Sequence, residues 1–440
     1  MYSRKDIWSI ALPILVSLFV QNLINITDTA FMGRVGQVEL GASALAGVLY
    51  LAFYMVTFGF STGAQILMAR RNGEAKYQAL GPIMGQGTLF LVLFSVVLVA
   101  ASLVWTPRLL DLLISSPAVR QAGEDYMEYR IFGLIFTSIG VMYRAFFVAI
   151  TRTRVLMVNA IIMTVANVVF NYIFVFGNFG APQMGIAGAA LGSVLAEASA
   201  ALHFVLYTFF CIDREKYQLS RFGFQGFALI REILNVSVWS MILYFLTIGT
   251  WFLFFVAVEH LGELPLAISN IIRSTSTLLF MPVNAFGATA CTLVSNAMGA
   301  HRADDVMPIV RRIIKMCYAI VLPLIALLCI VPQWILLIYT NDSALIADCT
   351  ASVYVMSSYY LLALPGNVLF QAVSGTGDTR TAFLIEMVTI VFYTLAIYVI
   401  IVRNRVDISF CWTVEYIYWG FKLMLSALFF KKANWRNKKI

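Results

Sequence analysis

The sequence predicts an all-α membrane protein, and three observations support that prediction. Of its 440 residues, 61% are hydrophobic and only 12% are charged, whereas a soluble domain has roughly 25% charged residues. The apolar residues form long runs, such as residues 89–105. These runs show no alternation of polar and apolar positions, as the strands of a membrane β-barrel would. The chain is therefore expected to cross a bilayer several times as helices.

Twelve such segments follow one another, each long enough to supply the roughly 20 residues that a bilayer requires. The predicted spans are residues 8–32, 42–68, 83–105, 122–148, 156–177, 186–210, 233–258, 266–295, 310–338, 346–372, 382–402 and 409–430. Several are longer than the bilayer needs, so tilted or kinked helices are expected.

The basic residues predict which loops face the cytoplasm. Lys and Arg concentrate in alternate loops, on the side that also holds both chain ends; among them are Arg4, Lys5, Arg70, Arg71 and Lys432. Cytoplasmic loops carry such an excess, so both termini are expected to be cytoplasmic. This placement accounts for the net charge of +8, and no nucleic-acid partner is expected.

The chain is expected to divide into two halves. The longest polar connection, residues 211–232, has six predicted spans on each side. The predicted division is an N-terminal six-helix bundle at 1–210, a cytoplasmic linker at 211–232 and a C-terminal six-helix bundle at 233–440.

These halves repeat each other in sequence. One constant offset in numbering places Gly36 on Gly262 and Gly73 on Gly299. Because six spans is an even number, both halves enter the membrane in the same sense. The repeat is therefore parallel, with a pseudo-two-fold axis along the membrane normal, as in transporters that bind substrate between their halves.

The first span contains a carboxylate that calls for an explanation. Gln21, Asn25 and Asp28 fall on one face of a helix at 3.6 residues per turn. A carboxylate at membrane depth costs at least a few kcal/mol, so it should face protein or water. Burial disfavours its charged form, which allows it to load and release a proton; with oxygen neighbours it could instead hold Na⁺. A purely structural hydrogen bond between helices is the alternative.

Four stretches resemble the multidrug and toxic compound extrusion (MATE) family of the MOP flippase superfamily. They are DTAFMGRVG at 28–36, FGFSTGAQILMARRNGE at 58–74, the segment 167–193 and SGTGDTR at 374–380. Together with the division into six and six spans, they cover essentially the whole chain.

The resemblance implies two six-helix bundles around a central cavity that opens alternately to each side. It implies an antiporter that exports organic, often cationic and amphipathic drugs or toxic metabolites in exchange for H⁺ or Na⁺. It implies no enzyme activity and no cofactor. The expected partners are a small organic substrate and membrane lipid, and the expected location is the bacterial cytoplasmic (inner) membrane. A monomer is expected because the internal repeat already supplies both halves.

The resemblance also implies a set of ion-coupling residues. Asp28 stands at the family's cation-coupling aspartate. Asn167 and Asn171 are spaced i, i+4 on one helix face and occupy positions of the family's coupling cluster, although one branch of the family has Asp where this chain has Asn171. Ser193 stands where the family often has Thr. Na⁺ at Asp28, Asn167 and Asn171 is the only metal expected. Asn residues also hold membrane helices together without any role in transport.

The second half departs from another branch of the family, which has Glu and Asp where this chain has Thr247 and Ala363. A cation site is therefore not expected there. With the offset that relates Gly36 to Gly262, Asp28 falls on Phe254, so the coupling chemistry is expected to be asymmetric.

Two further charged residues are candidates for the substrate cavity, together with Gln21 and Asn25. Arg273 could pair with Glu386 or Glu415, bind an anionic group of a substrate, or extend to the interface. Glu197 could be a second protonatable group or the partner of another polar residue.

Two other functions would require other sets of residues. A flippase for lipid-linked oligosaccharide or polysaccharide precursors would need several cationic side chains in its cavity, and Arg273, Arg130 and Arg144 are the candidates. A membrane enzyme would need paired Asp, His or Glu residues at one membrane face, and the sequence has no such group. The histidines His203, His260 and His301 have no metal-ligand spacing.

Overall fold

The computed structural model describes residues 2–114, 116–220, 223–340 and 342–438, and within these ranges the chain is helical without strands. Ten helices of the described chain are long and apolar enough to cross a membrane. Two shorter helices, α4 and α5, pass the same test only as a pair and meet at a bend of 51°. The protein is thus a multi-pass helical membrane protein, as the sequence predicts.

Every predicted span corresponds to a helix or a pair of helices. The long helices are α1 (Arg4–Val35), α2 (Gln37–Gly73), α3 (Leu80–Leu113), α4 (Pro117–Arg130), α5 (Gly133–Ala149), α6 (Arg154–Phe176), α7 (Gly185–Cys211), α9 (Phe227–Glu259), α10 (Glu263–Gly299), α11 (Val306–Ile330), α13 (Ser343–Gly375), α14 (Thr379–Ile397) and α16 (Val414–Lys432). Short helical pieces connect them: η1 (Tyr77–Ala79), η2 (Asn178–Gly180), α8 (Arg214–Tyr217), η3 (Ala303–Asp305), α12 (Pro332–Leu336), the π-helical η4 (Tyr398–Arg403), α15 (Ile408–Cys411) and η5 (Trp435–Asn437). The twelfth predicted span is α16, a 19-residue helix that is not among the ten apolar helices above and that carries Glu415, Lys422, Lys431 and Lys432.

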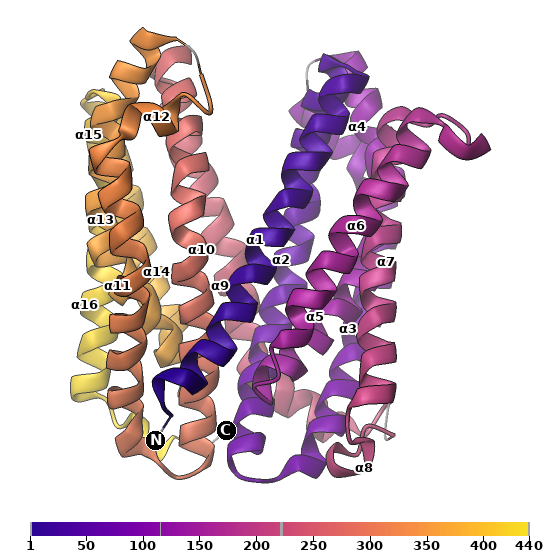
Figure 1. The fold of residues 1–440 in the computed structure, drawn as a ribbon, viewed down its shortest axis with the longest axis vertical. Helices are drawn as coiled ribbons and strands as arrows, with labels where there is room; N and C mark the ends of the chain where they lie inside the picture. Colours follow the sequence, from indigo (N-terminus) through magenta and orange to yellow (C-terminus); the bar gives the residue numbers. More distant parts are fainter. Residues whose placement is uncertain (1, 115, 221–222, 341, 439–440) are drawn as a thin grey trace. The chain divides into compact units, whose positions relative to one another are not determined.

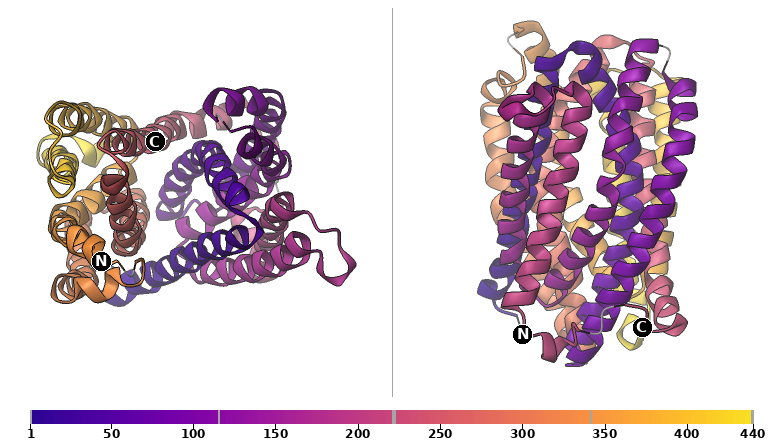
Figure 2. Two further views of the ribbon diagram at one scale, coloured as in Figure 1. Left: turned by 90° about the horizontal axis from the view of Figure 1, so that it is seen from above. Right: turned by 90° about the vertical axis from the view of Figure 1, so that its right-hand side faces the viewer.

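The helices group into two compact units. The N-terminal unit is Leu12–Tyr244, and the C-terminal unit combines Met1–Ala11 with Phe245–Ile440. In the N-terminal unit α6 packs along α7, and α2 packs against α4 and α5; in the C-terminal unit α13 packs against α10 and α16. Within each unit the long helices run side by side (Figures 1 and 2). The start of α1 and the end of α16 lie at the same end of the C-terminal unit (Figure 1).

The helix boundaries reproduce the predicted repeat. Helix α2 spans 37–73 and α10 spans 263–299, and the 3₁₀ turns that follow them span 77–79 and 303–305. Ala75 and His301 hold equivalent positions, with left-handed φ angles of 57° and 56°. The offset that aligns the glycines of the two halves thus also relates helix ends, turns and backbone conformation.

The repeat is broken at one place that matters for the site. Residues 117–149 form two helices, α4 and α5, whereas the equivalent residues 343–375 form the single helix α13. The break places Arg130 at the end of α4 and Gly133 at the start of α5. No proline marks this bend, so the sequence did not predict it.

Small residues allow close helix contacts in the N-terminal unit. A methyl group added at Gly59 would lie 2.5 Å from the Met241 Cα, and one at Gly63 would overlap Ser237. The Ser237 hydroxyl donates a hydrogen bond to the Phe60 carbonyl at 3.0 Å. Glycine contacts of this kind are typical of membrane helix packing, and they fix the start of α9 against α2.

Ion pairs tie the end of α2 to the first turns of α9. Glu74 lies 3.0 Å from Arg71 and 2.9 Å from Lys76, and Arg71 also reaches Glu232 at 2.5 Å. Partial burial alone would raise the pKa of Glu74, but hydrogen bonds from Lys76 and Arg71 outweigh burial and lower that pKa below its usual value of 4.5.

A folded-state pKa below the unfolded value means that ionised Glu74 stabilises the fold. That stabilisation is present above about pH 4.5 and is lost as the pH falls through the folded-state pKa. We therefore expect Glu74→Gln to unfold at a lower temperature than the parent at neutral pH, with the difference vanishing in acid. Thermal unfolding in detergent across a pH series measures this, and a difference independent of pH would contradict it.

Candidate functional site

The four residues of the predicted ion-coupling set come from three helices of the N-terminal unit. Asp28 lies on α1, Asn167 and Asn171 on α6, and Ser193 on α7. Asn167 and Asn171 are 1% and 0% exposed, and Ser193 is 7% exposed. Asp28 is half-buried. The i, i+4 spacing aligns the two asparagines on one face of α6, which is why both reach their neighbouring helices.

Hydrogen bonds join these four side chains in sequence. Asn171 Nδ2 donates to Asp28 Oδ1 at 2.6 Å and is 3.3 Å from Asn167 Oδ1. Asn167 Nδ2 donates to Ser193 Oγ at 3.3 Å, and Asn167 also lies within hydrogen-bonding reach of the Asp28 carboxylate. The carboxylate on α1 is thereby connected through α6 to α7. Amide N–H groups face it and stabilise its negative charge.

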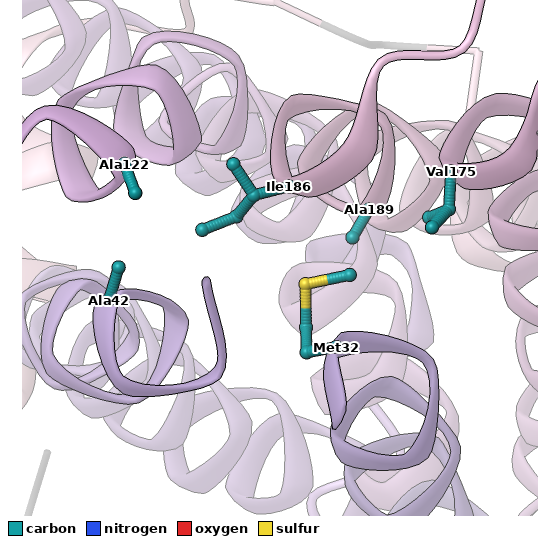
Figure 3. Close-up of a cluster of buried hydrophobic side chains, with 6 residues drawn as sticks. All are labelled: Met32, Ala42, Ala122, Val175, Ile186 and Ala189. Carbon is teal, nitrogen blue, oxygen red and sulfur yellow. The ribbon is translucent and has the colours of Figure 1, made fainter. Parts of the chain in front are cut away.

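An apolar cluster closes one end of this chain of hydrogen bonds. Met32, Val175 and Ala189 each lie four residues from a member of the chain, one turn further along α1 or α6, or one turn earlier on α7. In Figure 3 the Met32 side chain points toward Ala189. The buried cluster comprises Met32, Ala42, Ala122, Val175, Ile186 and Ala189. It shields the polar side chains from that end, which strengthens their electrostatic interactions.

A buried ion pair lies one helical turn away along α7. Arg130 Nη2 is 2.6 Å from Glu197 Oε1 and Arg130 Nη1 is 2.9 Å from Glu197 Oε2. Their side chains are 12% and 7% exposed. The Tyr50 hydroxyl donates to Glu197 at 3.1 Å, and the guanidinium lies 3.6 Å from the Tyr50 ring centre. The geometry is that of a two-pronged Arg–carboxylate pair.

The bend between α4 and α5 makes room for this pair. A methyl group at Gly133 would overlap both the Glu197 carboxylate and the Arg130 guanidinium. Of the two alternatives for Glu197, the structure shows the second: Glu197 is the partner of another polar residue, Arg130. Arg130 and Glu197 are also near enough to act electrostatically on Asp28, so the ion pair and the hydrogen-bonded chain form one polar region.

Gln21 and Asn25 precede Asp28 on α1, and both are exposed in the structure. Their side chains share the face of α1 that the spacing predicts. A role for either in binding a substrate stays a prediction.

The carboxylates considered as partners of Arg273 have other partners in the described chain. Glu386 Oε2 lies 2.8 Å from Lys422 Nζ, and Glu415 accepts hydrogen bonds from Tyr393 and Trp419. Arg273 is exposed, with its guanidinium 5.3 Å from the Phe255 ring centre. The pairing alternative for Arg273 is therefore not supported, because Glu386 pairs with Lys422 and Glu415 is held by neutral donors.

Sequence reasoning did not find the partners Arg130 and Lys422. Each is separated from its carboxylate by more than thirty residues, so spacing on one helix could not reveal the contact. The signal that was available is general: a charge within a membrane span pairs with another.

Gly192 positions Asn171 at the contact between α6 and α7. A methyl group there would overlap Asn171 Oδ1 and lie 3.0 Å from the Asn171 backbone nitrogen. We expect Gly192→Ala to displace Asn171 from Asp28 and to destabilise the protein by about 1–3 kcal/mol through overpacking.

The matched control is Gly47→Ala on α2, where an added methyl group meets no atom within 4 Å. Both changes gain the same helix propensity, about 1 kcal/mol, so the difference isolates the overlap. Thermal unfolding in detergent should show a lower midpoint for Gly192→Ala than for Gly47→Ala. Equal midpoints would show that α6 and α7 have more space than the structure indicates.

Comparison with protein families matches both halves of the chain to one family. The MatE model matches residues 13–173 and 240–399. The offset in numbering between the two matched segments is nearly the same as the offset between the boundaries of α2 and α10. The family match and the helix boundaries therefore agree on the internal repeat.

Known proteins that are similar to the chain include several named probable multidrug resistance protein NorM. The one from Thermotoga maritima is 24% identical over 448 residues, covering 99% of this chain and 94% of that protein. The one from Shewanella oneidensis is 24% identical over 391 residues, covering 88% of this chain and 84% of that protein.

Solved structures with a similar fold include two described as MATE transporters. One is a multidrug resistance transporter of the MOP superfamily in an outward-facing conformation, with a TM-score of 0.89, 16% identity, and coverage of 99% of this chain and 97% of that one. The other is eukaryotic, with a TM-score of 0.83, 18% identity, and coverage of 98% and 96%. At these identities the likeness shows the fold.

Proposed function

Because the chain belongs to the MatE family of multidrug and toxic compound extrusion transporters, we propose that it is a secondary antiporter that exports organic compounds in exchange for a cation. The relatives named as multidrug resistance proteins support a substrate range of drugs and toxic metabolites. The family consists of transporters, so no enzymatic activity and no cofactor enter the proposal.

Asp28 is the proposed coupling residue, and its hydrogen bond to Asn171 is the observation that carries the proposal. The bond at 2.6 Å connects α1 to α6. A hydrogen bond to a charged group stabilises by about 1.5–3 kcal/mol and a neutral one by about 0.5–1.5 kcal/mol. Protonating Asp28 would weaken the attachment of α1 to α6 by about 1 kcal/mol, roughly a fivefold shift in a conformational equilibrium.

The direction of the amide groups favours H⁺ over Na⁺ as the coupling ion. Both asparagines direct Nδ2 toward an acceptor, and Asn171 Oδ1 faces α7 at Gly192. Sodium would need oxygen atoms directed at it, and turning the Asn171 amide would place its nitrogen against Gly192. Proton binding at Asp28 requires no such rotation.

The proposed setting is a bacterial cytoplasmic membrane with both termini in the cytoplasm, as the basic loops indicate. Two six-helix halves, residues 1–210 and 233–440, joined by the linker 211–232, would act as the moving bodies of a monomer. Positions 221 and 222 of the linker lie outside the described residues.

The flippase alternative loses support from the partners of the arginines. A site for anionic lipid-linked sugars needs cations that are free to bind phosphate. Of the three candidate cations, Glu197 neutralises Arg130, which leaves Arg144, with its guanidinium 5.2 Å from the Phe58 ring centre, and exposed Arg273. Efflux of organic compounds is therefore the function that the polar region supports best.

Reconstitution tests the proposal directly. Purified protein in liposomes would be loaded with a fluorescent aromatic cation such as ethidium, and flux would be followed under a pH gradient and then under a Na⁺ gradient at equal pH on both sides. We expect flux under the pH gradient alone. Flux under the Na⁺ gradient alone would show that Na⁺ and not H⁺ is the coupling ion. Flux under neither gradient would overturn the antiporter proposal.

A further inference from the structure

The C-terminal unit contains a buried polar cluster that the proposed mechanism does not use. Glu386 on α14 is 1% exposed, and Glu415 and Lys422 on α16 are 6% and 5% exposed. Two acidic side chains thus share the described interior of this unit with one basic side chain. The charges do not balance if both carboxylates are ionised.

Lys422 forms its ion pair with Glu386. Its Nζ lies 2.8 Å from Glu386 Oε2 and donates to the Tyr418 hydroxyl at 2.9 Å. Glu386 Oε1 accepts hydrogen bonds from Tyr418 at 2.6 Å and Thr247 at 3.2 Å. The ammonium also lies 4.2 Å from the Phe370 ring centre. Lys422 is therefore paired directly with Glu386 rather than with Glu415.

Glu415 is held by neutral donors. The Tyr393 hydroxyl lies 2.8 Å from Glu415 Oε1, and Trp419 Nε1 donates to Oε2 at 3.1 Å. The other groups that act on it electrostatically are Lys422 on its own helix and three phenols, Tyr418 on α16 and Tyr359 and Tyr360 on α13. A buried carboxylate without a direct cationic partner is expensive to keep charged.

From this geometry we propose that Glu415 is a proton-binding site of the C-terminal unit, separate from Asp28. Trp419 Nε1 can only donate, so Oε2 remains the acceptor in both states. The proton binds at Oε1. The Tyr393 hydroxyl, which can donate or accept, then rotates to accept the new O–H at the same 2.8 Å separation.

The surroundings select a proton rather than a metal ion. A bound cation would face the Trp419 N–H, which offers no lone pair. No group of three or more His, Cys, Asp or Glu side chains suited to a metal ion occurs within the described part of the chain. One donor-only neighbour and one neighbour that can reverse its role suit the gain and loss of a single proton.

Proton binding at Glu415 changes the hydrogen bond that connects the two helices of the cluster. Tyr393 lies on α14 and Glu415 on α16, so the hydrogen bond between them changes from charge-assisted to neutral when Glu415 is protonated. Any use of this change in transport rests on the proposed antiport, whereas proton binding itself does not.

Infrared spectroscopy of the protein in lipid tests the site without any transport. The Asp28→Asn variant serves as the starting protein, so that Asp28 cannot contribute to the carbonyl band of protonated carboxyl groups. We expect the carboxyl band of this protein to contain a pH-dependent component that is lost in Asp28→Asn/Glu415→Gln. The band should persist when exposed Glu263 is changed instead, in Asp28→Asn/Glu263→Gln.

A second variant keeps the test decisive if Glu415→Gln fails to fold. Trp419→Phe retains Glu415 but removes the donor to its carbonyl oxygen, so the band should move to higher frequency. A band that Glu415→Gln leaves unchanged would overturn the proposal, and where Glu415→Gln does not fold, a band that Trp419→Phe leaves unchanged would do the same. Because no substrate is involved, a failure of drug efflux would leave this result unaffected.

Discussion

The Asp28→Asn variant is expected to lose ion-driven efflux while folding and entering the membrane normally. Asparagine retains the size of the side chain and a carbonyl oxygen that can accept from Asn171, which lies 2.6 Å away in the parent. It cannot take up or release a proton. A change of charge on Asp28 would shift the conformational equilibrium, so in the Asp28→Asn variant this equilibrium becomes insensitive to pH. Efflux from intact cells and from reconstituted liposomes measures the loss, with membrane expression compared in parallel.

The matched control for this variant is Asp111→Asn at the end of α3. Asp111 is 65% exposed and pairs with Arg120 at the surface, and such pairs contribute about 0–1 kcal/mol. The control should transport like the parent. Full efflux by Asp28→Asn would exclude Asp28 as the coupling residue, whatever the control does.

The largest effect on stability is expected from breaking the buried Arg130–Glu197 pair. Arg130→Met leaves the Glu197 carboxylate, 7% exposed, with the Tyr50 hydroxyl but no cation. Removing one partner of a buried pair costs about 3–5 kcal/mol. Thermal or denaturant unfolding in detergent should therefore show a much lower midpoint for the single variant.

The double variant Arg130→Met/Glu197→Met separates charge from packing. Replacing both partners of a buried pair by apolar residues of similar volume is often neutral or stabilising, and Tyr50 retains Thr137 as a partner at 3.2 Å. The double variant should recover most of the lost stability. A double variant as unstable as the single one would show that the region depends on the shape of these side chains rather than on charge balance.

The sequence predicted those features that repeat along the chain or follow from spacing on one helix. The offset read from Gly36 and Gly262 recurs in the bounds of α2 and α10. The i, i+4 pair Asn167 and Asn171 does reach toward Asp28. Periodicity fixes which side of a helix a residue occupies, so these contacts followed from a correct placement of the spans.

Contacts between distant segments could not be predicted in this way. The bend that admits Arg130 beside Glu197 has no proline to announce it. The pairing of Lys422 with Glu386 depends on how α16 and α14 are rotated against each other. Helix rotation is set by packing in three dimensions, and a single sequence does not display it.

The asymmetry between the halves was visible in the sequence, although only in part. Phe254, the position equivalent to Asp28, is 1% exposed and packs 4.9 Å from the Trp412 ring centre. The counterpart of the proposed coupling carboxylate is therefore an aromatic contact. The polar cluster of the C-terminal unit lies instead on α14 and α16, where the repeat gave no reason to expect it.

The most direct test of proton coupling at Asp28 is substrate-driven proton flux. Liposomes containing the protein and a trapped pH indicator would receive an organic cation on one side, with no ion gradient imposed. Protons should move opposite to the substrate in the parent and in Asp111→Asn, and none should move in Asp28→Asn. Equal proton movement in the parent and in Asp28→Asn would contradict coupling at Asp28.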